Sequence, residues 1–202
     1  MRFFLTSDDP KSKARALTLS KKLNIEIFKK PPQKQIKEFS EDYFFTCSKG
    51  RLFLKKGLRQ NSKPIFSDFD DWAKNYDDNL LKNSTKGLPA NFSCLDLTAG
   101  FGKDALEISK VVNCKSLVLV EKEAWVFELL VDGIKNISCS RAGGLLKKFK
   151  TFNMDNLEFL ESKNETFDLI YIVPMFVGVK KSKAKKLMQA LRDLSTAVIQ
   201  KE

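Results

Sequence analysis

The 202-residue sequence predicts an α/β protein: a parallel sheet covered by helices on both faces, preceded by a smaller α+β module. Three observations predict this fold class. From Asn91 onward, short apolar segments alternate with segments of helical character, which is typical of buried parallel strands joined by helices. A glycine-containing turn follows the first of these apolar segments. The first 60 or so residues lack this alternation and instead combine one helix with several short strands.

The first part of the chain, residues 1–61, is expected to form the small α+β module. An apolar strand begins at Arg2, and Asp9 with Pro10 supplies an N-cap and a first-turn proline for a helix that ends near Leu23. Apolar runs after this helix predict three more strands, of which the last two form a hairpin through a glycine turn. These strands cover residues 25–28, 43–47 and 51–55.

A strand-helix linker is expected over residues 62–90, because a strand near Pro64 leads into a helix that ends in a loop bounded by Gly87 and Pro89. The main domain, residues 91–202, follows. Its continuous apolar strands cover residues 92–97, 116–121, 149–153 and 167–173. Helices are expected at 102–111, 123–135 and 155–161, and a basic helix at 182–194 precedes a possible fifth strand at 196–200.

The composition limits the chemistry of this chain. It contains no histidine, and its four cysteines lie far apart without a Cys-x-x-Cys pair, which argues against a zinc site and against imidazole-assisted catalysis. The apolar runs are shorter than the ~18 residues of a membrane span. Asp8 and Asp9 interrupt the N-terminal apolar patch too early for a signal peptide. We therefore expect a cytoplasmic protein with no metal and no membrane partner.

The charge of the chain is strongly positive. Lysine and arginine number 36 against 25 acidic residues, which gives a formal charge of +11. The surplus recurs as clusters along the sequence, so the fold has the means to gather several clusters on one face. Such a face favours a polyanionic partner. Each single cluster is also compatible with an ordinary solvated surface.

The stretch "LDLTAGFGKDA" (95–105) follows the first strand of the main domain and opens a helix. In such a turn a nucleotide-like ligand lies across the carboxyl ends of parallel strands, because Gly100 and Gly102 let it approach the backbone. The glycine spacing alone does not exclude NAD. Asp96 favours S-adenosylmethionine, since it would repel a pyrophosphate but suits an ammonium group. Asp104 lies in the first helical turn, where the helix dipole favours an acid with or without a ligand.

Two further acids are candidate ligands of a nucleoside. Glu121 ends the second strand, where an acid accepts hydrogen bonds from the ribose hydroxyls of either cofactor. Asp155 begins the helix after the third strand. Its side chain either meets the adenine amine or acts only as an N-cap. These acids predict a bound nucleoside without distinguishing S-adenosylmethionine from NAD.

The fourth strand ends in "IYIVPMF" (170–176). Many methyltransferases that modify an exocyclic amine carry here an acid or amide, then proline, then two residues that end in an aromatic. The first residue accepts hydrogen bonds from the amine, the proline fixes the turn, and the aromatic ring stacks on the extruded base. In this chain Val173 takes the first position and is followed by Pro174 and Phe176.

Taken in order, "DLTAGFGKDA", "LVEKE" and "PMF", followed by a lysine-rich helix, resemble the RsmJ family of bacterial small-subunit ribosomal RNA guanine-N2 methyltransferases. The resemblance covers roughly residues 62–200, including "IFSDF" (65–69). It implies a Rossmann-like class I S-adenosylmethionine-dependent methyltransferase sheet, with Pro174 and Phe176 as catalytic residues of the target-base pocket. The candidate cofactor-binding residues are Asp96, Thr98, Gly100, Gly102, Asp104, Glu121 and Asp155.

The chain departs from the family in the substrate half. Val173 stands where the family has an aspartate, "DWAKNYDDNLLKNS" replaces a basic, glycine-rich segment, and the last hairpin of the usual sheet is expected to be absent. The main hypothesis is a methyltransferase that acts on ribosomal RNA or the small ribosomal subunit. One alternative is a noncatalytic relative that binds RNA or assists ribosome assembly. The other is an NAD-dependent oxidoreductase, for which no hydride-relay residue is found. The candidate RNA-binding residues are Lys180, Lys181, Lys183, Lys185 and Lys186.

Overall fold

The computed structural model describes residues 2–29, 37–58, 63–75 and 79–173. This part of the chain forms two compact units, one up to Phe66 and one from Ser67 onward. Most of the segment that we expected as a linker therefore packs within the second unit. No helix in these ranges is long and apolar enough to cross a membrane.

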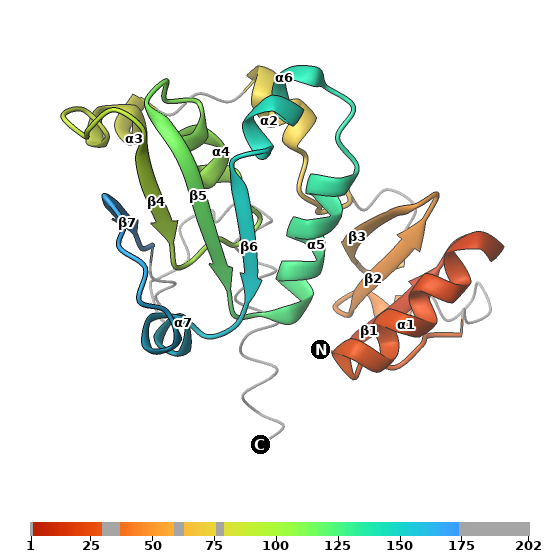
Figure 1. Cartoon of the computed structure of the whole chain (residues 1–202). Helices are drawn as coiled ribbons and strands as arrows, with labels where there is room; N and C mark the ends of the chain where they lie inside the picture. Colours follow the sequence, from red (N-terminus) through yellow and green to blue (C-terminus); the bar gives the residue numbers. More distant parts are fainter. Residues whose placement is uncertain (1, 30–36, 59–62, 76–78, 174–202) are drawn as a thin grey trace. The chain divides into compact units, whose positions relative to one another are not determined.

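The first unit is a three-stranded sheet with one α-helix (Figure 1). Strands β1 (Phe3–Ser7) and β2 (Tyr43–Ser48) are parallel, and β2 pairs with β3 (Arg51–Lys56) as an antiparallel hairpin. The short 3-10 helix η1 (Pro10–Ser12) and helix α1 (Lys13–Leu23) lie in the connection from β1 to β2. Parallel neighbours need a crossover of this kind, because a tight turn cannot return the chain in the same direction.

The N-terminal capping of this helical segment agrees with the sequence. The side chain of Asp9 accepts a hydrogen bond from the backbone N–H of Ser12 at 2.9 Å. The predicted strand at 25–28 is wrong, because only a single bridge forms, between Ile27 and Leu5. The N–H of Leu5 donates to the carbonyl of Glu26 at 2.9 Å and the N–H of Phe28 donates to the carbonyl of Leu5 at 2.8 Å, so the segment pairs with β1 at one position and no strand ladder develops.

The second unit contains a four-stranded parallel sheet in the order β6-β5-β4-β7. The strands are β4 (Phe92–Asp96), β5 (Cys114–Glu121), β6 (Phe149–Asn153) and β7 (Leu169–Tyr171). Strand β4 is the first of these strands in the sequence, but it lies between β5 and β7, so the strand order reverses between β4 and β7. In open α/β sheets ligands bind at the carboxyl ends of the strands at such a point. The predicted helix 182–194 and strand 196–200 lie outside the described residues.

Helices cover both faces of this sheet. Helices α4, α5 and α6 contribute Leu106, Leu130 and Leu146 to an apolar cluster on one face, together with Phe69 of α2. Helix α7 covers the other face, where Phe159 packs with strand residues of β4 and β5. The bounds of the helices are α2 (Phe69–Asn75), α3 (Asn79–Ser84), α4 (Lys103–Ser109), α5 (Ala124–Lys135), α6 (Ser140–Leu146) and α7 (Asn156–Ser162). The arrangement confirms the predicted fold class.

Helix α6 was not predicted from the sequence, because Gly143 and Gly144 lower the helix propensity of its short segment. The helix starts where Asp70 of α2 fixes the preceding backbone. The carboxylate of Asp70 accepts hydrogen bonds from the N–H of Ser138 at 3.0 Å and of Cys139 at 2.9 Å. Partial burial works to raise the pKa of Asp70, but the hydrogen bonds from Ser138 and Cys139 lower it overall. A contact between distant segments thus sets the start of α6.

Candidate cofactor site

The loop after β4 is held by the strands on both sides. The N–H of Leu97 donates to the carbonyl of Tyr171 in β7 at 3.0 Å, and the N–H of Ala99 donates to the carbonyl of Val120 in β5 at 3.0 Å. The loop therefore spans the carboxyl ends of three neighbouring strands. This is the position where the reversed strand order favours ligand binding.

Two buried carboxylates, Asp96 and Glu121, lie under this loop. Asp96 is 1% exposed, and its Oδ1 accepts the N–H of Thr98 at 2.9 Å. Glu121 is 9% exposed and accepts the N–H of Gly100 at 2.8 Å and the N–H of Glu123 at 2.8 Å. These backbone donors fix the orientation of both carboxylates. The structure thus brings together two acids that are 25 positions apart in the sequence.

Burial makes these acids costly to ionise. Desolvation raises the pKa of Asp96 to about 7; the backbone N–H of Thr98 opposes this rise, and the charges of Asp104 and Glu121 add to it. Desolvation also raises the pKa of Glu121, against the hydrogen bonds from Glu123 and Gly100. A positively charged group placed beside these carboxylates would offset the cost of their burial.

The two glycines of the turn serve different needs. Gly100 has φ 54° and Gly102 has φ 81°, in the left-handed region that favours glycine. A Cβ atom on Gly100 would meet only the carbonyl oxygen of Thr98, at 3.9 Å. On Gly102 it would lie 2.6 Å from Leu130 Cδ1 and 2.9 Å from Phe69 Cζ. Gly100 therefore leaves its side of the loop open for a ligand, whereas Gly102 lets α4 start against the core.

Ser67, in the segment "IFSDF" (65–69), contacts both the glycine turn and helix α5, and these contacts were not predicted from the sequence. The hydroxyl of Ser67 is buried and donates to the carbonyl of Phe101 at 2.8 Å. Gly133 of α5 packs against the same serine, since a Cβ atom there would lie 2.4 Å from Ser67 Cβ. The only sequence signal for this packing is a glycine in the middle of an otherwise regular apolar helix.

Two hydrogen bonds join the turn to the end of β7. The hydroxyl of Tyr171 donates to Asp104 Oδ2 at 3.0 Å, and the N–H of Val173 donates to Thr98 Oγ1 at 2.8 Å. Tyr171 was missed at the sequence level, although its place on the same face of the strand as Val173 is a usable signal. These hydrogen bonds therefore join the glycine turn to Val173, the first residue of the predicted target-base motif.

We expect Thr98→Val to lower the free energy of unfolding of the second unit by about 1 kcal/mol, because the substitution removes a net hydrogen bond between the turn and Val173. Chemical denaturation followed by tryptophan fluorescence measures the change. Thr98→Ser keeps the hydroxyl and should behave as the unmodified protein. An unchanged free energy of unfolding in Thr98→Val would show that this hydrogen bond does not stabilise the turn.

Asp155 acts as the N-cap of α7 in the structure. Its Oδ1 accepts the N–H of Leu157 at 2.9 Å, and its Oδ2 lies 3.1 Å from Nζ of Lys122. The hydrogen bond from Leu157 lowers the pKa of Asp155, and Lys122 adds to the effect. Beside it, the side-chain amide of Asn153 donates to the carbonyl of Glu121 at 2.8 Å and anchors the strand end. An adenine contact by Asp155 stays a prediction.

Several predicted site residues lie outside the described part of the chain: Pro174, Phe176, Lys180, Lys181, Lys183, Lys185 and Lys186. Within the described ranges, no group of three or more His, Cys, Asp or Glu side chains is arranged to hold a metal ion. The described site therefore consists of the glycine turn, its acids and the end of β7.

The fold and this site define a class of protein, an α/β domain whose glycine turn and buried acids lie where open parallel sheets bind nucleotide-like ligands. A family model described as "Putative SAM-dependent methyltransferase" matches residues 33–198, and the chain belongs to this family. The likeness to a solved S-adenosylmethionine-dependent methyltransferase from Neisseria gonorrhoeae has a TM-score of 0.65 at 18% identity, over 86% of this chain and 70% of that one. This likeness supports the fold.

Sequence relatives carry the name ribosomal RNA small subunit methyltransferase J. The protein of Francisella tularensis subsp. novicida is 26% identical over 187 residues, which cover 85% of this chain and 77% of the relative. That of Hahella chejuensis is 29% identical over 163 residues, or 75% of this chain and 60% of the relative. The chain is thus a distant relative of these enzymes, and the resemblance seen in the motifs is confirmed.

Proposed function

We propose that this chain transfers a methyl group from S-adenosylmethionine to the exocyclic amine of a guanine in small-subunit ribosomal RNA. The observation that carries the proposal is the buried pair of Asp96 and Glu121 at the glycine turn, where Gly100 leaves open space. The family supports the cofactor. The names of the relatives support ribosomal RNA as the substrate.

The residues of the turn fit the proposed cofactor. When bound, S-adenosylmethionine supplies an electrophilic methyl group on a positively charged sulfur. Asp96 would neutralise the cationic amino-acid end, and that charge would offset the desolvation that raises the pKa of Asp96 to about 7. Glu121 would accept hydrogen bonds from ribose hydroxyls, with its carboxylate already oriented by the N–H of Gly100 and of Glu123.

The methyl acceptor would lie at the end of β7. Transfer in line to an amine nitrogen would break the sulfur–methyl bond, leave the cofactor as a neutral thioether and release one amine proton to water. The site would therefore have to hold the base close and oriented rather than to supply a strong base. The carbonyl of Val173 would accept a hydrogen bond from the amine. Pro174 and Phe176 would form the rest of the base pocket, and the lysines at 180–186 would contact RNA phosphates.

A second candidate function is RNA binding without methyl transfer. The observation that favours it is Val173, which stands where the resembled family has an aspartate and whose own N–H is donated to Thr98. Its side chain is 45% exposed and has no polar atom to orient an amine. Calorimetry with S-adenosylmethionine, combined with transfer of labelled methyl groups to small subunits that lack the modification, separates the two candidates.

We expect Val173→Asp to raise kcat by about tenfold or more, because one positioned polar group in such a site is typically worth 100- to 1,000-fold, roughly 2.7–4 kcal/mol. Labelled methyl transfer to unmodified small subunits measures the gain. Val173→Thr has a similar shape and keeps the N–H that bonds Thr98, so it serves as the control without a carboxylate. If the unmodified chain and Val173→Asp both bind cofactor and neither transfers methyl groups, the noncatalytic function is correct.

A further inference from the structure

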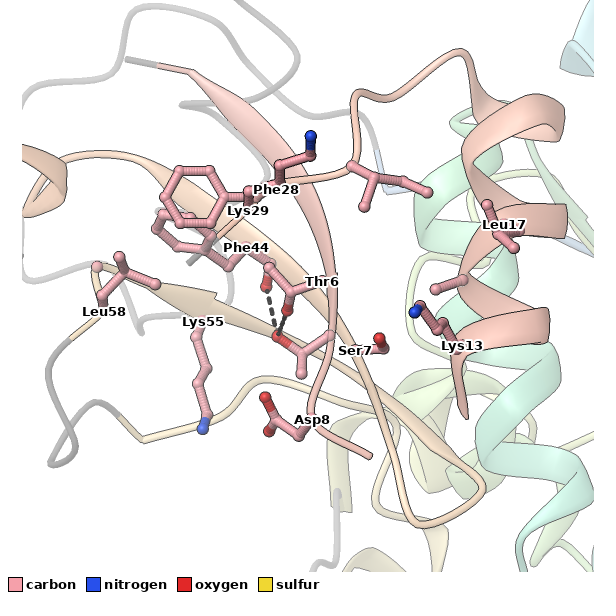
Figure 2. A pocket seen from close by; sticks show the side chains of 14 residues that line it. Thr6, Ser7, Asp8, Lys13, Leu17, Phe28, Lys29, Phe44, Lys55 and Leu58 are labelled. Carbon is pink, nitrogen blue, oxygen red and sulfur yellow. Dashed lines mark hydrogen bonds between the residues drawn. The ribbon is translucent and has the colours of Figure 1, made fainter. Parts of the chain in front are cut away.

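The first unit contains a pocket of about 700 Å³, and none of its lining residues belongs to the candidate cofactor site. It is lined by residues of α1, of strands β1, β2 and β3, and of the segments 27–29 and 57–58. Figure 2 shows Thr6 and Ser7 of β1 between Lys13 and Leu17 of α1 on one side and Phe44 with other side chains on the opposite side. All of its lining residues belong to this unit.

The positive surplus of the protein lies almost entirely in this part of the chain. Residues 1–66 contain 16 lysines and arginines against six acids, whereas residues 67–202 contain 20 against 19. The described lining of the pocket contains three lysines, Lys13, Lys29 and Lys55, and one acid, Asp8. A polyanion is therefore attracted to the first unit, and the lining adds local positive charge.

The remaining lining side chains suit a nucleotide. The ring of Phe28 is half-buried at the pocket wall, with its centroid 5.0 Å from that of Phe44. Beside it, the hydroxyl of Thr6 donates to Thr46 Oγ1 at 3.0 Å. The ammonium group of Lys55 lies 4.9 Å from the Phe53 ring centroid, where its position is restrained. Aromatic rings that stack on bases, next to lysines that meet phosphates, are the usual elements of single-strand binding sites.

We infer that this pocket binds a nucleotide of single-stranded RNA and is the main RNA-docking site of the chain. The inference rests on the proposed function for RNA as the substrate. Phe28 would stack on a base, and Lys13, Lys29 and Lys55 would contact the phosphates on either side of it. An acidic peptide would use the lysines but would gain nothing from the aromatic wall, so the combination favours RNA. The first unit thus holds the RNA while the second unit holds the cofactor.

The test uses the full chain without cofactor and a labelled single-stranded RNA of about 12 nucleotides, within the range of known single-strand sites. We expect the double variant Lys13→Glu and Lys55→Glu to weaken binding by about tenfold or more. Its slope of log affinity against log salt should be shallower by about 0.7 for each phosphate that the variant no longer neutralises. The control double variant, Lys21→Glu and Lys37→Glu, has the same charge change on exposed residues outside the lining. Equal weakening in both variants, or none in the first, overturns the inference.

A third variant separates stacking from charge. Phe28→Leu keeps an apolar side chain in the aromatic cluster and should weaken RNA binding several-fold with an unchanged salt slope; circular dichroism checks that it folds. Free nucleoside monophosphate and a poly-glutamate peptide are the competing ligands. If either binds as tightly as the RNA and depends equally on Lys13 and Lys55, the RNA assignment is wrong.

The same variants distinguish this inference from the proposed function. If the unmodified chain transfers methyl groups and the Lys13 and Lys55 double variant still binds RNA, the pocket is not the RNA-docking site, and the proposed function stands. If RNA binding requires the pocket but the chain neither binds S-adenosylmethionine nor transfers methyl groups, the proposed function is wrong, and the assignment of the pocket to RNA stands.

Discussion

Asp96→Asn is expected to raise the Kd for S-adenosylmethionine by about 10- to 150-fold, because a hydrogen bond to a charged group is worth about 1.5–3 kcal/mol. The amide keeps an oxygen that can accept the N–H of Thr98, so the loop geometry survives while the negative charge is removed. Isothermal calorimetry measures the change. Asp168→Asn, which neutralises an exposed acid bonded to Ser93, is the matched control and should leave the Kd unchanged.

The affinity of the unmodified chain should depend on pH for the same reason. The pKa of Asp96 is about 7, so protonation removes the charge that a cationic cofactor needs as the pH falls below about 7. We expect affinity to fall by up to about tenfold for each pH unit below that point. Calorimetry at pH values on both sides of 7 tests this, and the trend attributable to this carboxyl should vanish in Asp96→Asn. A pH-independent affinity would show that the carboxylate does not contact the cation.

The same substitution is expected to stabilise the fold at high pH in the absence of ligand. Between the unfolded pKa of about 3.9 and the folded pKa of about 7, the native state holds a proton that the unfolded state has released, so the free energy of unfolding falls as the pH rises. Asp96→Asn removes this cost and should raise that free energy by about 1 kcal/mol or more near pH 8, with little change near pH 4. Asp168→Asn should give no such gain, because hydrogen bonds from Ser93 hold the pKa of Asp168 below its usual range.

Gly102→Ala is expected to lower the free energy of unfolding of the second unit by about 2–4 kcal/mol. The left-handed backbone at φ 81° costs a residue with a Cβ about 1–2 kcal/mol. The added methyl group would also lie 2.6 Å from Leu130 and 2.9 Å from Phe69, and overpacking of this kind costs about 1–3 kcal/mol. Trp72 and Trp125 are the two tryptophans of the chain, so denaturation followed by their fluorescence reports on this unit.

Gly143→Ala provides the matched control for the same change. Gly143 lies within α6, and a Cβ atom there would meet nothing within 4 Å. Alanine should therefore stabilise α6 by up to about 1 kcal/mol through its higher helix propensity. A loss of only about 1–2 kcal/mol in Gly102→Ala, the cost of the left-handed backbone alone, would show that no packing constraint acts on Gly102.

Much of the second unit could be predicted from the sequence. The strands at 92–97, 116–121 and 149–153 are recognisable because continuous apolar runs are typical of parallel strands buried on both faces. The acids and glycines of the turn are recognisable because their spacing relative to those strands is local. The same reasoning failed for α6, whose start depends on Asp70 from a segment 68 positions earlier. It also failed for residues 25–28, where apolar character suggested a strand but the segment pairs with the sheet only through the single bridge between Ile27 and Leu5.

The sequence by itself determined the class of sheet, the place of the glycine turn and the choice of acids around it, because these features depend on neighbours a few positions apart. Only the tertiary structure decided that Asp96 is buried and has a raised pKa. The same holds for the lack of room for a methyl group at Gly102 and for the hydrogen bond between Val173 and Thr98. Desolvation, packing and hydrogen bonding at these positions come from residues far away in the chain, and no local pattern contains that information.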